Sequence, residues 1–450
     1  MKQVDAVVIG GGVLGCFAAR NLRKWNISTL LLESGEDVCT GVTRANSAIV
    51  YAGYDNRSGS LKAAMTAAGN AAMETLCTEL EVPFRRTGSF LVSFGERGDG
   101  VLRRKLENGR ENGVPELELL CGEEARQREP FLSPNARSAL YAPTTGTVNP
   151  WLLGIAAYEN AVENGCEVRM RAPVRAISAS GGGYIVETDG EIFSCKAVLN
   201  CAGLYADRVQ ELLFPPSVRI FWDSADFLLL DRHIPAPEHI LFHETENGEK
   251  GVTAVPTAEG NLLLEGSRRP LEGELFSTTP AGLSAVRQQM QSVLPKLDGN
   301  RVLRSFAAVR PNPYRVVKQG GEYVWDGKSI GNFVIAHPAS GFFSLIGIKT
   351  PGLTCAQELG AYLAAETAKF LDAAPNKSFD GRRRAIHRKN HDIVCMCGGI
   401  SEAEILEAIA RGAATVDGVK RRVGTGMGRC QGSRCAVRIE ELLEASHGRS

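Results

Sequence analysis

The chain has 450 residues, of which 44% are hydrophobic and 23% are charged, values typical of a globular protein with two or three domains. Its 51 basic and 51 acidic residues give a formal net charge of zero, which argues against nucleic acid or an anionic membrane as a long-range partner. The sequence has no apolar run long enough for a membrane-spanning helix and no signal-peptide pattern at its start. Eight of its twelve cysteines are scattered singly, mostly in apolar surroundings, so we expect a reducing, cytoplasmic location.

The first 33 residues have the pattern of a dinucleotide-binding β-α-β unit. A buried strand is predicted over residues 4–9, a helix over 16–24 and a second strand over 28–32. Gly10, Gly12 and Gly15 fill the frame G-x-G-x-x-G, and Glu33 follows the second strand. The glycines permit a tight turn, close approach of a pyrophosphate and close helix packing, while Glu33 is placed to bind ribose hydroxyls. The unit alone is compatible with NAD or FAD.

Helical and strand patterns alternate through the remainder of the first 370 residues. Helices are predicted over 61–80, 101–112, 123–129, 151–164, 280–294 and 355–370. Strands are predicted over 87–94, 196–200, 301–310, 323–337 and 342–346, with antiparallel strands within 167–186 and more strands within 219–266. We therefore expect an α/β fold whose Rossmann-like layer is assembled from the first, middle and last thirds of the chain, with a β-rich domain inserted. The arginine-rich residues 371–390 indicate a solvated linker, or alternatively a segment resting on the main body or a partner.

Three segments rich in small residues are candidates for contact with a dinucleotide. Thr43, Asn46 and Ser47 lie in a polar loop after the first unit, for which a plain surface loop is the alternative. Residues 200–207 (NCAGLYAD) and 347–354 (GIKTPGLT) each connect a predicted strand to a predicted helix. Such turns let the backbone lie against a cofactor, although a generic strand-to-helix turn has the same pattern.

Four cysteines are grouped near the C-terminus. Cys395 and Cys397 form a C-x-C motif, and Cys430 and Cys435 follow after 32 residues within a glycine-rich stretch. Four thiolates from two loops suit zinc or an iron–sulfur cluster, while disulfides are the alternative. The C-x-C spacing is shorter than the usual zinc-ribbon C-x-x-C, and the glycines leave backbone N–H groups free for cluster sulfurs. We therefore favour a [2Fe–2S] cluster.

Motifs along nearly the whole chain resemble a known family. They are VVIGGGVLG with Glu33, the segment 43–53, GTVNP at 146–150, NCAGLYAD, FAAVRP at 306–311 and GIKTPGLT. These motifs resemble the FAD-dependent oxidoreductases of the D-amino-acid-oxidase superfamily, and most closely its branch with anaerobic glycerol-3-phosphate dehydrogenase and L-2-hydroxyglutarate dehydrogenase. The ending VCMC…GMGRCQGSRC resembles the [2Fe–2S] domain related to bacterioferritin-associated ferredoxin.

The resemblance implies a division of the chain into three parts. Residues 1–370 would form the oxidoreductase domain, with FAD-binding parts at about 1–80, 146–210 and 330–370 and substrate parts at about 81–145 and 211–329. Residues 371–390 would be the linker, and residues 391–450 the small helical [2Fe–2S] domain.

The resemblance also implies which residues hold the cofactors. The FAD-binding positions would be Gly10, Gly12, Val13, Leu14, Gly15, Glu33 and Ser34 at the ADP end; Thr43, Asn46 and Ser47 at the pyrophosphate and ribityl chain; Val174 at the adenine; Ala202 and Gly203 behind the dinucleotide; and Gly347, Ile348, Lys349, Gly352 and Leu353 at the pyrimidine edge of the flavin. The cluster ligands would be Cys395, Cys397, Cys430 and Cys435.

Catalysis is predicted to combine a cation site and a base. Arg310 is the preferred clamp for an anionic substrate, because a bidentate guanidinium suits carboxylate or phosphate, and a structural ion pair is its alternative. Lys349 would stabilise the anionic reduced flavin, unless it is a surface lysine. His243, His337 and Tyr51 are the candidate bases. Relatives often carry histidine where Tyr51 stands, and residues 241–244 depart from the usual apolar pattern, so the substrate is not specified.

The main hypothesis is a dehydrogenase that oxidises a small anionic 2-hydroxy acid or glycerol 3-phosphate and passes electrons through the cluster to a protein or subunit. No second G-x-G-x-x-G unit is evident, so direct use of NAD is not expected. The alternatives are an amino-acid or amine oxidase and a non-catalytic electron-transfer or redox subunit. We expect no nucleic-acid partner, and membrane association only peripherally, through a partner.

Overall fold

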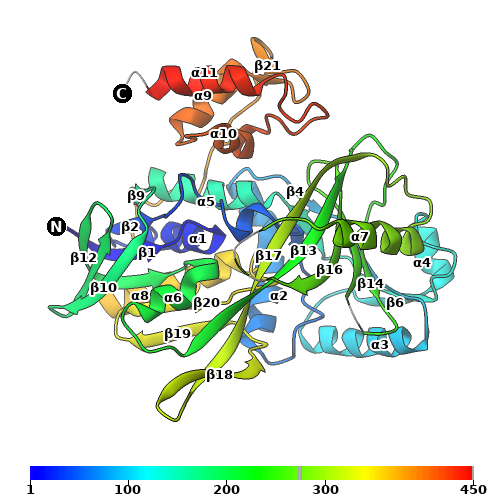
Figure 1. Cartoon of the computed structure of the whole chain (residues 1–450), viewed down its shortest axis with the longest axis horizontal. Helices are drawn as coiled ribbons and strands as arrows, with labels where there is room; N and C mark the ends of the chain where they lie inside the picture. Colours follow the sequence, from blue (N-terminus) through cyan, green and yellow to red (C-terminus); the bar gives the residue numbers. More distant parts are fainter. Residues whose placement is uncertain (249, 272, 274–275, 448–450) are drawn as a thin grey trace.

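The structure is a computed structural model that describes residues 1–248, 250–271, 273 and 276–447. Two large sheets lie side by side, and a small helical group formed by the C-terminal residues packs above them in Figure 1. No helix in this described part of the chain combines the length and apolar character needed to cross a membrane.

The first large sheet carries the N-terminal β-α-β unit. Its strands β10, β11, β12, β1, β2 and β9 lie side by side in that order, β20 pairs with β12, and β19 pairs with β20. The bounds are β1 (Lys2–Ile9), β2 (Thr29–Leu32), β9 (Glu167–Arg169), β10 (Val174–Ser180), β11 (Gly183–Thr188), β12 (Ile192–Asn200), β19 (Val334–Ala339) and β20 (Phe342–Ile346). β1 is parallel to β2 and β12, and β12 is parallel to β20. The predicted assembly of this layer from three parts of the chain is confirmed.

Helices cover this sheet and provide its tightest packing. They are α1 (Val13–Leu22), α2 (Leu61–Glu79), α5 (Pro150–Glu163), α6 (Ala206–Glu211) and α8 (Ala356–Leu371). α1 packs against α5 and α8, and Cys16, Phe17 and Ala18 on it are fully buried. α1 begins at Val13, three residues earlier than predicted, because the backbone of Gly12 is extended and serves as its N-cap. Its free N–H groups therefore lie directly beside the glycine loop.

One part of the predicted strand pattern was wrong. The alternation within residues 167–186 predicts antiparallel strands, but β9 pairs in parallel with β2, and only β10 and β11 form the antiparallel hairpin. The reason is the preceding helix α5, a crossover element that returns the chain in the direction of β2. Periodicity within a strand does not report the direction of its partner.

The second large sheet has nine strands in the order β18-β17-β13-β16-β15-β14-β5-β7-β6. The bounds are β5 (Ser89–Ser93), β6 (Glu118–Cys121), β7 (Ser138–Ala142), β13 (Val218–Leu230), β14 (Ile240–Glu244), β15 (Lys250–Pro256), β16 (Leu262–Pro270), β17 (Val302–Gln319) and β18 (Glu322–Ser329). Helix α7 (Pro280–Val293) packs on it through Val286 and Met290, while α3 (Glu96–Glu111) and α4 (Gly122–Arg128) lie beside β5, β6 and β7. A small sheet of β3 (Ile49–Val50), β8 (Gly146–Val148) and β4 (Phe84–Arg86) lies between the layers.

β17 is longer than the predicted strand over 301–310. It continues through Pro311 and Pro313, residues that normally disfavour a central strand. β17 pairs with β13 along this stretch, but its pairing with β18 begins only at Tyr314. The missing amide donors of the two prolines therefore remove no bond to β18.

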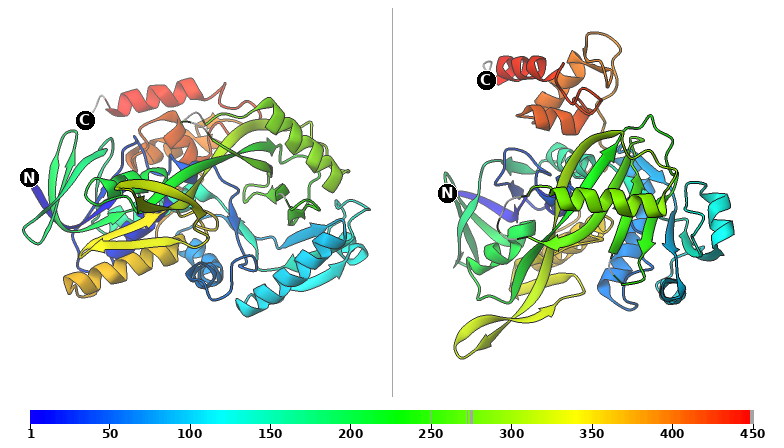
Figure 2. Two further views of the ribbon diagram at one scale, coloured as in Figure 1. Left: turned by 60° about the horizontal axis from the view of Figure 1, so that its bottom comes forward. Right: turned by 45° about the vertical axis from the view of Figure 1, so that its right-hand side comes forward.

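The C-terminal residues form a separate small core. β21 (Ile393–Cys395) and β22 (Ile400–Ser401) form a two-stranded sheet, followed by α9 (Glu402–Ala410), α10 (Val416–Val423) and α11 (Ala436–His447). Ile405, Val419 and Ile439 lie at the centre of this core. In the right-hand view of Figure 2 this unit lies on one side of the two large sheets. We refer to residues 393–447 as the cluster domain.

The segment expected to be a solvated linker is only partly exposed. The Arg20 guanidinium and the Asn160 amide donate to the carbonyl oxygens of Gly381 and Asp380, respectively. Arg383 is 2% exposed and pairs with Glu159 of α5 at 2.7 Å. The alternative expectation, a segment that rests on the main body, describes residues 380–383.

Candidate functional site

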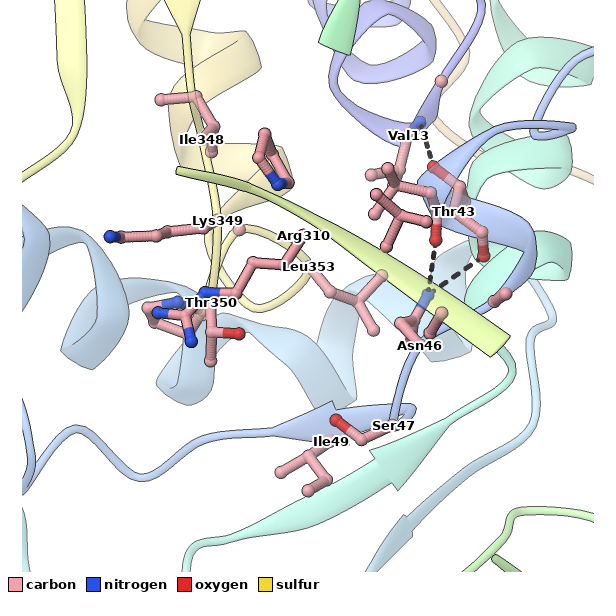
Figure 3. A pocket seen from close by; sticks show the side chains of 18 of the residues that line it. Val13, Thr43, Asn46, Ser47, Ile49, Arg310, Ile348, Lys349, Thr350 and Leu353 are labelled. Atoms are coloured by element: carbon pink, nitrogen blue, oxygen red, sulfur yellow. Dashed lines mark hydrogen bonds between the residues drawn. The ribbon is translucent and has the colours of Figure 1, made fainter. Parts of the chain in front are cut away.

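A cavity of about 940 Å³, including its open mouth, lies between the two large sheets. Figure 3 shows its lining. The lining residues of the first sheet and its loops include Gly12, Val13, Leu14, Thr43, Asn46, Ser47, Ile348, Lys349, Gly352 and Leu353, and those of the second sheet include Ala225, Phe227, Glu265, Arg268, Ala308 and Arg310. The cavity therefore joins the predicted dinucleotide site to the inner face of the second sheet.

The glycine loop is packed too closely against neighbouring backbone for side chains at Gly10 and Gly15. Gly10 has a φ of +102°, and a Cβ at this position would lie 2.6 Å from the carbonyl oxygen of Cys201. A Cβ at Gly15 would lie 1.8 Å from the carbonyl oxygen of Gly10. A Cβ at Gly12 would meet its nearest atom, Oγ1 of Thr43, only at 3.6 Å. Gly12 also lines the cavity, so its backbone is accessible to a ligand. This loop fits a pyrophosphate at the N-terminus of α1.

Glu33 stabilises the same loop. Its carboxylate accepts hydrogen bonds from the backbone N–H groups of Gly11 and Gly35, both at 2.6 Å. The Ser34 hydroxyl donates to it at 3.2 Å. A carboxylate has about four acceptor positions, so these three bonds leave room for a ribose hydroxyl.

The polar loop after β2 has a fixed conformation. The Thr43 hydroxyl accepts a hydrogen bond from the N–H of Val13 at 3.0 Å. The Asn46 amide donates to the carbonyl oxygens of Val42 and Thr43 and accepts from the N–H of Ala48. Figure 3 shows Val13, Thr43 and Asn46 on one side of the cavity. The plain-loop alternative does not account for this packing against the glycine loop.

The other predicted cofactor residues divide into two groups. Ile348, Lys349, Gly352 and Leu353 line the cavity, whereas Val174, Ala202, Gly203 and Gly347 are not among its lining residues. Val174 and Ala202 pack against the same apolar cluster as β1 and β2, on the side where the ADP end is expected. Cys201, the neighbour of Ala202, lines the cavity.

Cations from three elements line the cavity. Arg310 comes from β17, Arg268 from β16, and Lys349 from the turn after β20. The side chain of Arg310 forms no hydrogen bond or ion pair with any residue that the structure describes, and its Nε is buried. Burial, reinforced by the charges of Arg310 and Lys62, lowers the pKa of Lys349 to about 8. An anion in the cavity would relieve this repulsion.

A bulge in the second sheet places an acid and a base on one face. Ala225 of β13 pairs with Arg268, but Phe227, two residues later, pairs with Glu265, three residues earlier on β16. This register shift turns both Glu265 and Arg268 toward the cavity, where they form an ion pair at 2.9 Å. The small side chain of Ala225, paired with Ala308, leaves space in front of them.

Tyr51 also lines the cavity, stacked against Phe242 with ring centroids 6.1 Å apart. Burial, with the nearby Glu265 carboxylate, raises the pKa of Tyr51 to about 12, although the Ser47 hydroxyl and the arginines oppose this shift. Tyr51 is therefore a neutral hydrogen-bonding group at physiological pH and a poor base.

Neither candidate histidine lies at the cavity. Phe242 faces Tyr51, so the alternation of β14 turns His243 to the opposite face, where its ring meets Phe94 edge-on at 5.2 Å. His337 packs between Phe343 and Tyr362. Neither histidine is among the lining residues.

The C-terminal cysteines are arranged in two pairs. The Sγ atoms of Cys397 and Cys430 are 3.5 Å apart, and the thiols of Cys395 and Cys435 contact each other in the interior of the cluster domain. No group of three or more His, Cys, Asp or Glu side chains in the described part of the chain surrounds a single metal position. A tetrahedral zinc site gathers all four ligands around one ion, whereas a [2Fe–2S] cluster has two ligands on each iron. Two pairs therefore fit the cluster better than zinc.

Backbone donors support this assignment. The N–H groups of Gly432 and Arg434 point to the sulfur of Cys430, and the first of these is the main reason why the pKa of its thiol is lowered. Such donors stabilise a thiolate ligand.

Comparisons with known proteins agree with this geometry. Residues 5–366 match the FAD dependent oxidoreductase family. The chain belongs to this family. Residues 393–445 match the BFD-like [2Fe-2S] binding domain. The FAD-dependent oxidoreductase thus has two cofactors, FAD and a [2Fe–2S] cluster.

Several relatives of this oxidoreductase act on small hydroxy compounds. It is 36% identical over 99% of its length to the glycerol 3-phosphate dehydrogenase of Caloramator mitchellensis, and covers 94% of that protein. It is 30% identical to the human mitochondrial L-2-hydroxyglutarate dehydrogenase, in a match that covers 51% of this chain and 52% of that protein. Among solved structures, the reduced L-α-glycerophosphate oxidase of Mycoplasma pneumoniae with FAD bound has a TM-score of 0.75 at 24% identity, covering 85% of this chain and 99% of that one. The glycine oxidase of Geobacillus kaustophilus has a TM-score of 0.71 at 20% identity, covering 84% of this chain and 97% of that one, and shares the fold.

Two functional candidates escaped the sequence analysis. Glu265 and Arg268 lie in an apolar strand and its charged end, LLLEGSRR, and an acid within such a run is the available signal. Their position opposite Arg310 depends on the bulge, which no local pattern reveals.

Proposed function

We propose that this oxidoreductase is a dehydrogenase that converts the secondary alcohol of glycerol 3-phosphate to a ketone and passes the electrons through its cluster to an acceptor. The observation that supports this most strongly is the cavity itself. Three cations face a space that is also lined by the glycine loop and the turn at 347–354. The full-length similarity to a glycerol 3-phosphate dehydrogenase, cluster domain included, supports the same substrate.

We propose that FAD occupies the part of this cavity next to the first sheet. When bound there, it supplies hydride acceptance from the substrate carbon. The residues proposed to hold it are those predicted from the sequence: Gly10, Gly12, Val13, Leu14, Gly15, Glu33, Ser34, Thr43, Asn46, Ser47, Val174, Ala202, Gly203, Gly347, Ile348, Lys349, Gly352 and Leu353. Lys349 would offset negative charge at the pyrimidine edge of the ring.

The substrate phosphate is proposed to bind between Arg310 and Arg268. Arg310 offers a guanidinium that forms no ion pair with a described carboxylate, although Asp223 and Glu265 lie near enough to act on its charge, and Arg268 offers a second one that Glu265 holds in place at 2.9 Å. Two guanidinium groups suit a dianion better than a monoanion, because each forms charge-assisted hydrogen bonds to separate oxygens. L-2-hydroxyglutarate, also a dianion, is the second candidate, supported by the similarity to its dehydrogenase.

The hydroxyl proton is proposed to pass to Glu265. It is the carboxylate among the lining residues, and neither histidine is placed to act. Tyr51, kept neutral by its raised pKa, would orient the hydroxyl by a hydrogen bond. Glu265→Gln should lower kcat by a larger factor than it raises KM, since the variant also weakens the contact that holds Arg268, and native kcat in this variant would refute the assignment.

The domain limits and the cellular setting remain proposals. We propose an oxidoreductase domain over 1–370, a connecting segment over 371–390 and a [2Fe–2S] domain over 391–450, whose last three residues lie outside the described part. None of the twelve cysteines, all of which lie in the described part of the chain, forms a disulfide. This supports a cytoplasmic, reducing location. An electron-accepting protein or subunit, with no nucleic acid, completes the proposal.

Anaerobic reduction tests the substrate directly. The FAD- and cluster-loaded protein is mixed without oxygen with glycerol 3-phosphate, L-2-hydroxyglutarate or glycine, and flavin absorbance is followed. Glycerol 3-phosphate should bleach the flavin fastest. Faster bleaching by glycine, together with rapid peroxide release in air, would instead support an amine oxidase. No bleaching by any of the three would support a non-catalytic electron-transfer subunit.

A further inference from the structure

The contact between the cluster domain and the flavin-binding sheet is built from buried charges. Asp37, in the loop after β2, is 1% exposed, and Arg421 and Arg422 of α10 are each 5% exposed. Arg422 donates from Nη1 and Nη2 to the two oxygens of Asp37 at 2.7 and 2.9 Å, and Arg421 donates from Nη2 at 2.8 Å. Arg422 thus forms a bidentate pair with Asp37, a strong and directional form of ion pair.

A second carboxylate extends this contact to the connecting segment. Glu159 of α5 is 5% exposed and pairs with Arg383 at 2.7 Å and with Arg411 at 3.2 Å. The Nε of Arg422 lies 3.7 Å from the same carboxylate. The flavin-binding sheet therefore supplies the acids, while the connecting segment and the cluster domain supply the bases. Replacement of one partner by a neutral residue would leave a buried charge without its counter-charge in the docked state, which is strongly unfavourable.

Asp37 is also part of the wall of the glycine loop. Its neighbour Val38 packs over Gly11, at 3.0 Å from the position that a Cβ of that glycine would take. Cys39 donates its N–H to the carbonyl oxygen of Gly11 at 2.9 Å. Glu33, four residues earlier, accepts from the N–H of Gly11. The loop at 33–39, to which Arg421 and Arg422 donate hydrogen bonds, is thus the loop that encloses the proposed pyrophosphate and ribose site.

α10 approaches Asp37 closely at Gly418. A Cβ at Gly418 would lie 3.1 Å from Oδ2 of Asp37. Burial acts to raise the pKa of the Asp37 carboxyl, but Arg422 and Arg421 outweigh it and keep the pKa below its usual value. The carboxylate is therefore charged at neutral pH, and it accepts hydrogen bonds from both arginines.

The cysteine loop is joined to the second sheet as well. Arg429, which precedes Cys430, pairs with Asp231 at the end of β13 at 2.7 Å. Arg429 is 63% exposed on its side chain, so this contact is weaker than those of Asp37. It contacts the sheet that carries Arg310, whereas Asp37 belongs to the sheet that carries the glycine loop. The cluster domain thus touches both walls of the cavity.

We infer that the Asp37–Arg421–Arg422 contact makes docking of the cluster domain and binding of FAD cooperative, with Asp37 as a positioning residue. Docking orders the loop at 33–39, so FAD meets a site that is already formed. By linkage, bound FAD holds the same loop in the conformation that α10 requires. Bound FAD thereby favours the docked position of the cluster domain. This inference rests on the proposed placement of FAD at the glycine loop.

The first test is FAD affinity in matched variants. Flavin-free, cluster-containing protein is titrated with FAD and its fluorescence is followed for the native chain, Arg422→Met and Arg438→Met. Arg438 is the control, because it belongs to the same domain but pairs with Glu402 and Glu441 on its exposed side. Arg422→Met should raise the dissociation constant at least tenfold and Arg438→Met less than twofold. An unchanged constant in Arg422→Met would overturn the inference.

The second test measures the reciprocal effect, without turnover. Hydrogen–deuterium exchange of the α10 amides is compared with and without FAD, with the α11 amides as an internal reference. FAD should slow exchange in α10 at least threefold in the native chain and leave it unchanged in Arg422→Met. A native chain in which FAD leaves α10 unaffected would contradict cooperativity, whereas a purely structural ion pair would give the same exchange with and without FAD.

A milder variant keeps the inference testable if Arg422→Met loses its cluster absorbance. Arg421→Met removes one hydrogen bond to Asp37 instead of two. A threefold or larger rise of its FAD dissociation constant supports the inference, and a native constant overturns it. Neither readout uses the substrate, so failure of glycerol 3-phosphate to reduce the flavin would refute the proposed function and leave this test intact.

Discussion

Two regions of the molecule contain several buried or half-buried cations, and they differ in how those cations are paired. Where the cluster domain meets the first sheet, Arg383, Arg421 and Arg422 contact Asp37 and Glu159 at 2.7–2.8 Å. In the cavity, Arg268 has Glu265, but Arg310 has no such partner among the described residues. Paired charges at the first region hold two domains together. The cations of the cavity are incompletely neutralised, so they can bind an anionic ligand.

This comparison predicts opposite effects of removing a charge in the two regions. Loss of a cavity cation should impair substrate binding and spare the fold. Loss of an interface charge should destabilise the fold and spare the chemistry, because the substrate site is formed by other residues.

The largest effect is expected at Arg310. Arg310→Met should lower kcat/KM for glycerol 3-phosphate about 10³-fold, because a desolvated charge pair with substrate contributes about 2–5 kcal/mol. Its thermal stability should be native or higher, since a half-buried guanidinium without an ion-pair partner disfavours folding. Steady-state kinetics and a melting curve measure both. Arg315→Met, an exposed position on the same strand, is the control and should be native in both respects. A clear loss of stability in Arg310→Met would show that Arg310 is a structural residue.

The next largest effect is expected at Asp37. Asp37→Asn keeps the side-chain shape but removes the main counter-charge of two buried guanidinium groups, which keep only Asp417 at 2.8 Å and Glu159 at 3.7 Å. This loss should lower the free energy of unfolding by about 3 kcal/mol. Denaturant unfolding followed by fluorescence measures this loss. With FAD saturating, the rate at which glycerol 3-phosphate reduces the flavin should stay within about twofold of native. Arg438→Met should cost less than about 1 kcal/mol, as exposed pairs do; equal losses in the two variants would remove the distinction between the regions.

A smaller effect is expected from pH. The pKa of Lys349 is lowered to about 8 by burial and by neighbouring cations, so the ammonium is charged below this pH and neutral above it. The proposed support that Lys349 gives to the reduced flavin, by offsetting negative charge at the pyrimidine edge, should therefore be lost as the pH rises through about 8. The pH profile of kcat/KM should show this decline, and Lys349→Met should lack it. A profile that rises through the same range would identify Lys349 as the base.

The features predicted correctly from the sequence are those formed by residues that are close together along the chain. The glycine loop with Glu33, the turn at 347–354 and the four cysteines are contiguous patterns. In the structure Gly12 and the turn line one cavity, Glu33 accepts a hydrogen bond from the glycine loop, and the cysteines lie in two pairs. Arg310 was also named from the sequence, because its guanidinium suits an anionic substrate, and it lines the same cavity. These features depend on neighbours along the chain.

The remaining features depend on partners that are distant in sequence. The contact of Asp37 with Arg422 joins residues 385 positions apart, and no local pattern predicts it. Glu265 and Arg268 face the cavity because of a bulge, which depends on the pairing of β16 with β13. His243 was a wrong choice for the same reason: one position along β14 decides between the cavity face and the face of Phe94.

The most direct test of the account is an anaerobic titration of the native protein and of Cys430→Ser with glycerol 3-phosphate. Each substrate molecule delivers two electrons, while FAD accepts two and the cluster one. The native protein should therefore need about 1.5 equivalents for full bleaching of both cofactors, and Cys430→Ser, without a cluster, about 1.0 equivalent for the flavin alone. Flavin that does not bleach in either protein, or a native cluster that stays oxidised while the flavin is reduced, would contradict the account.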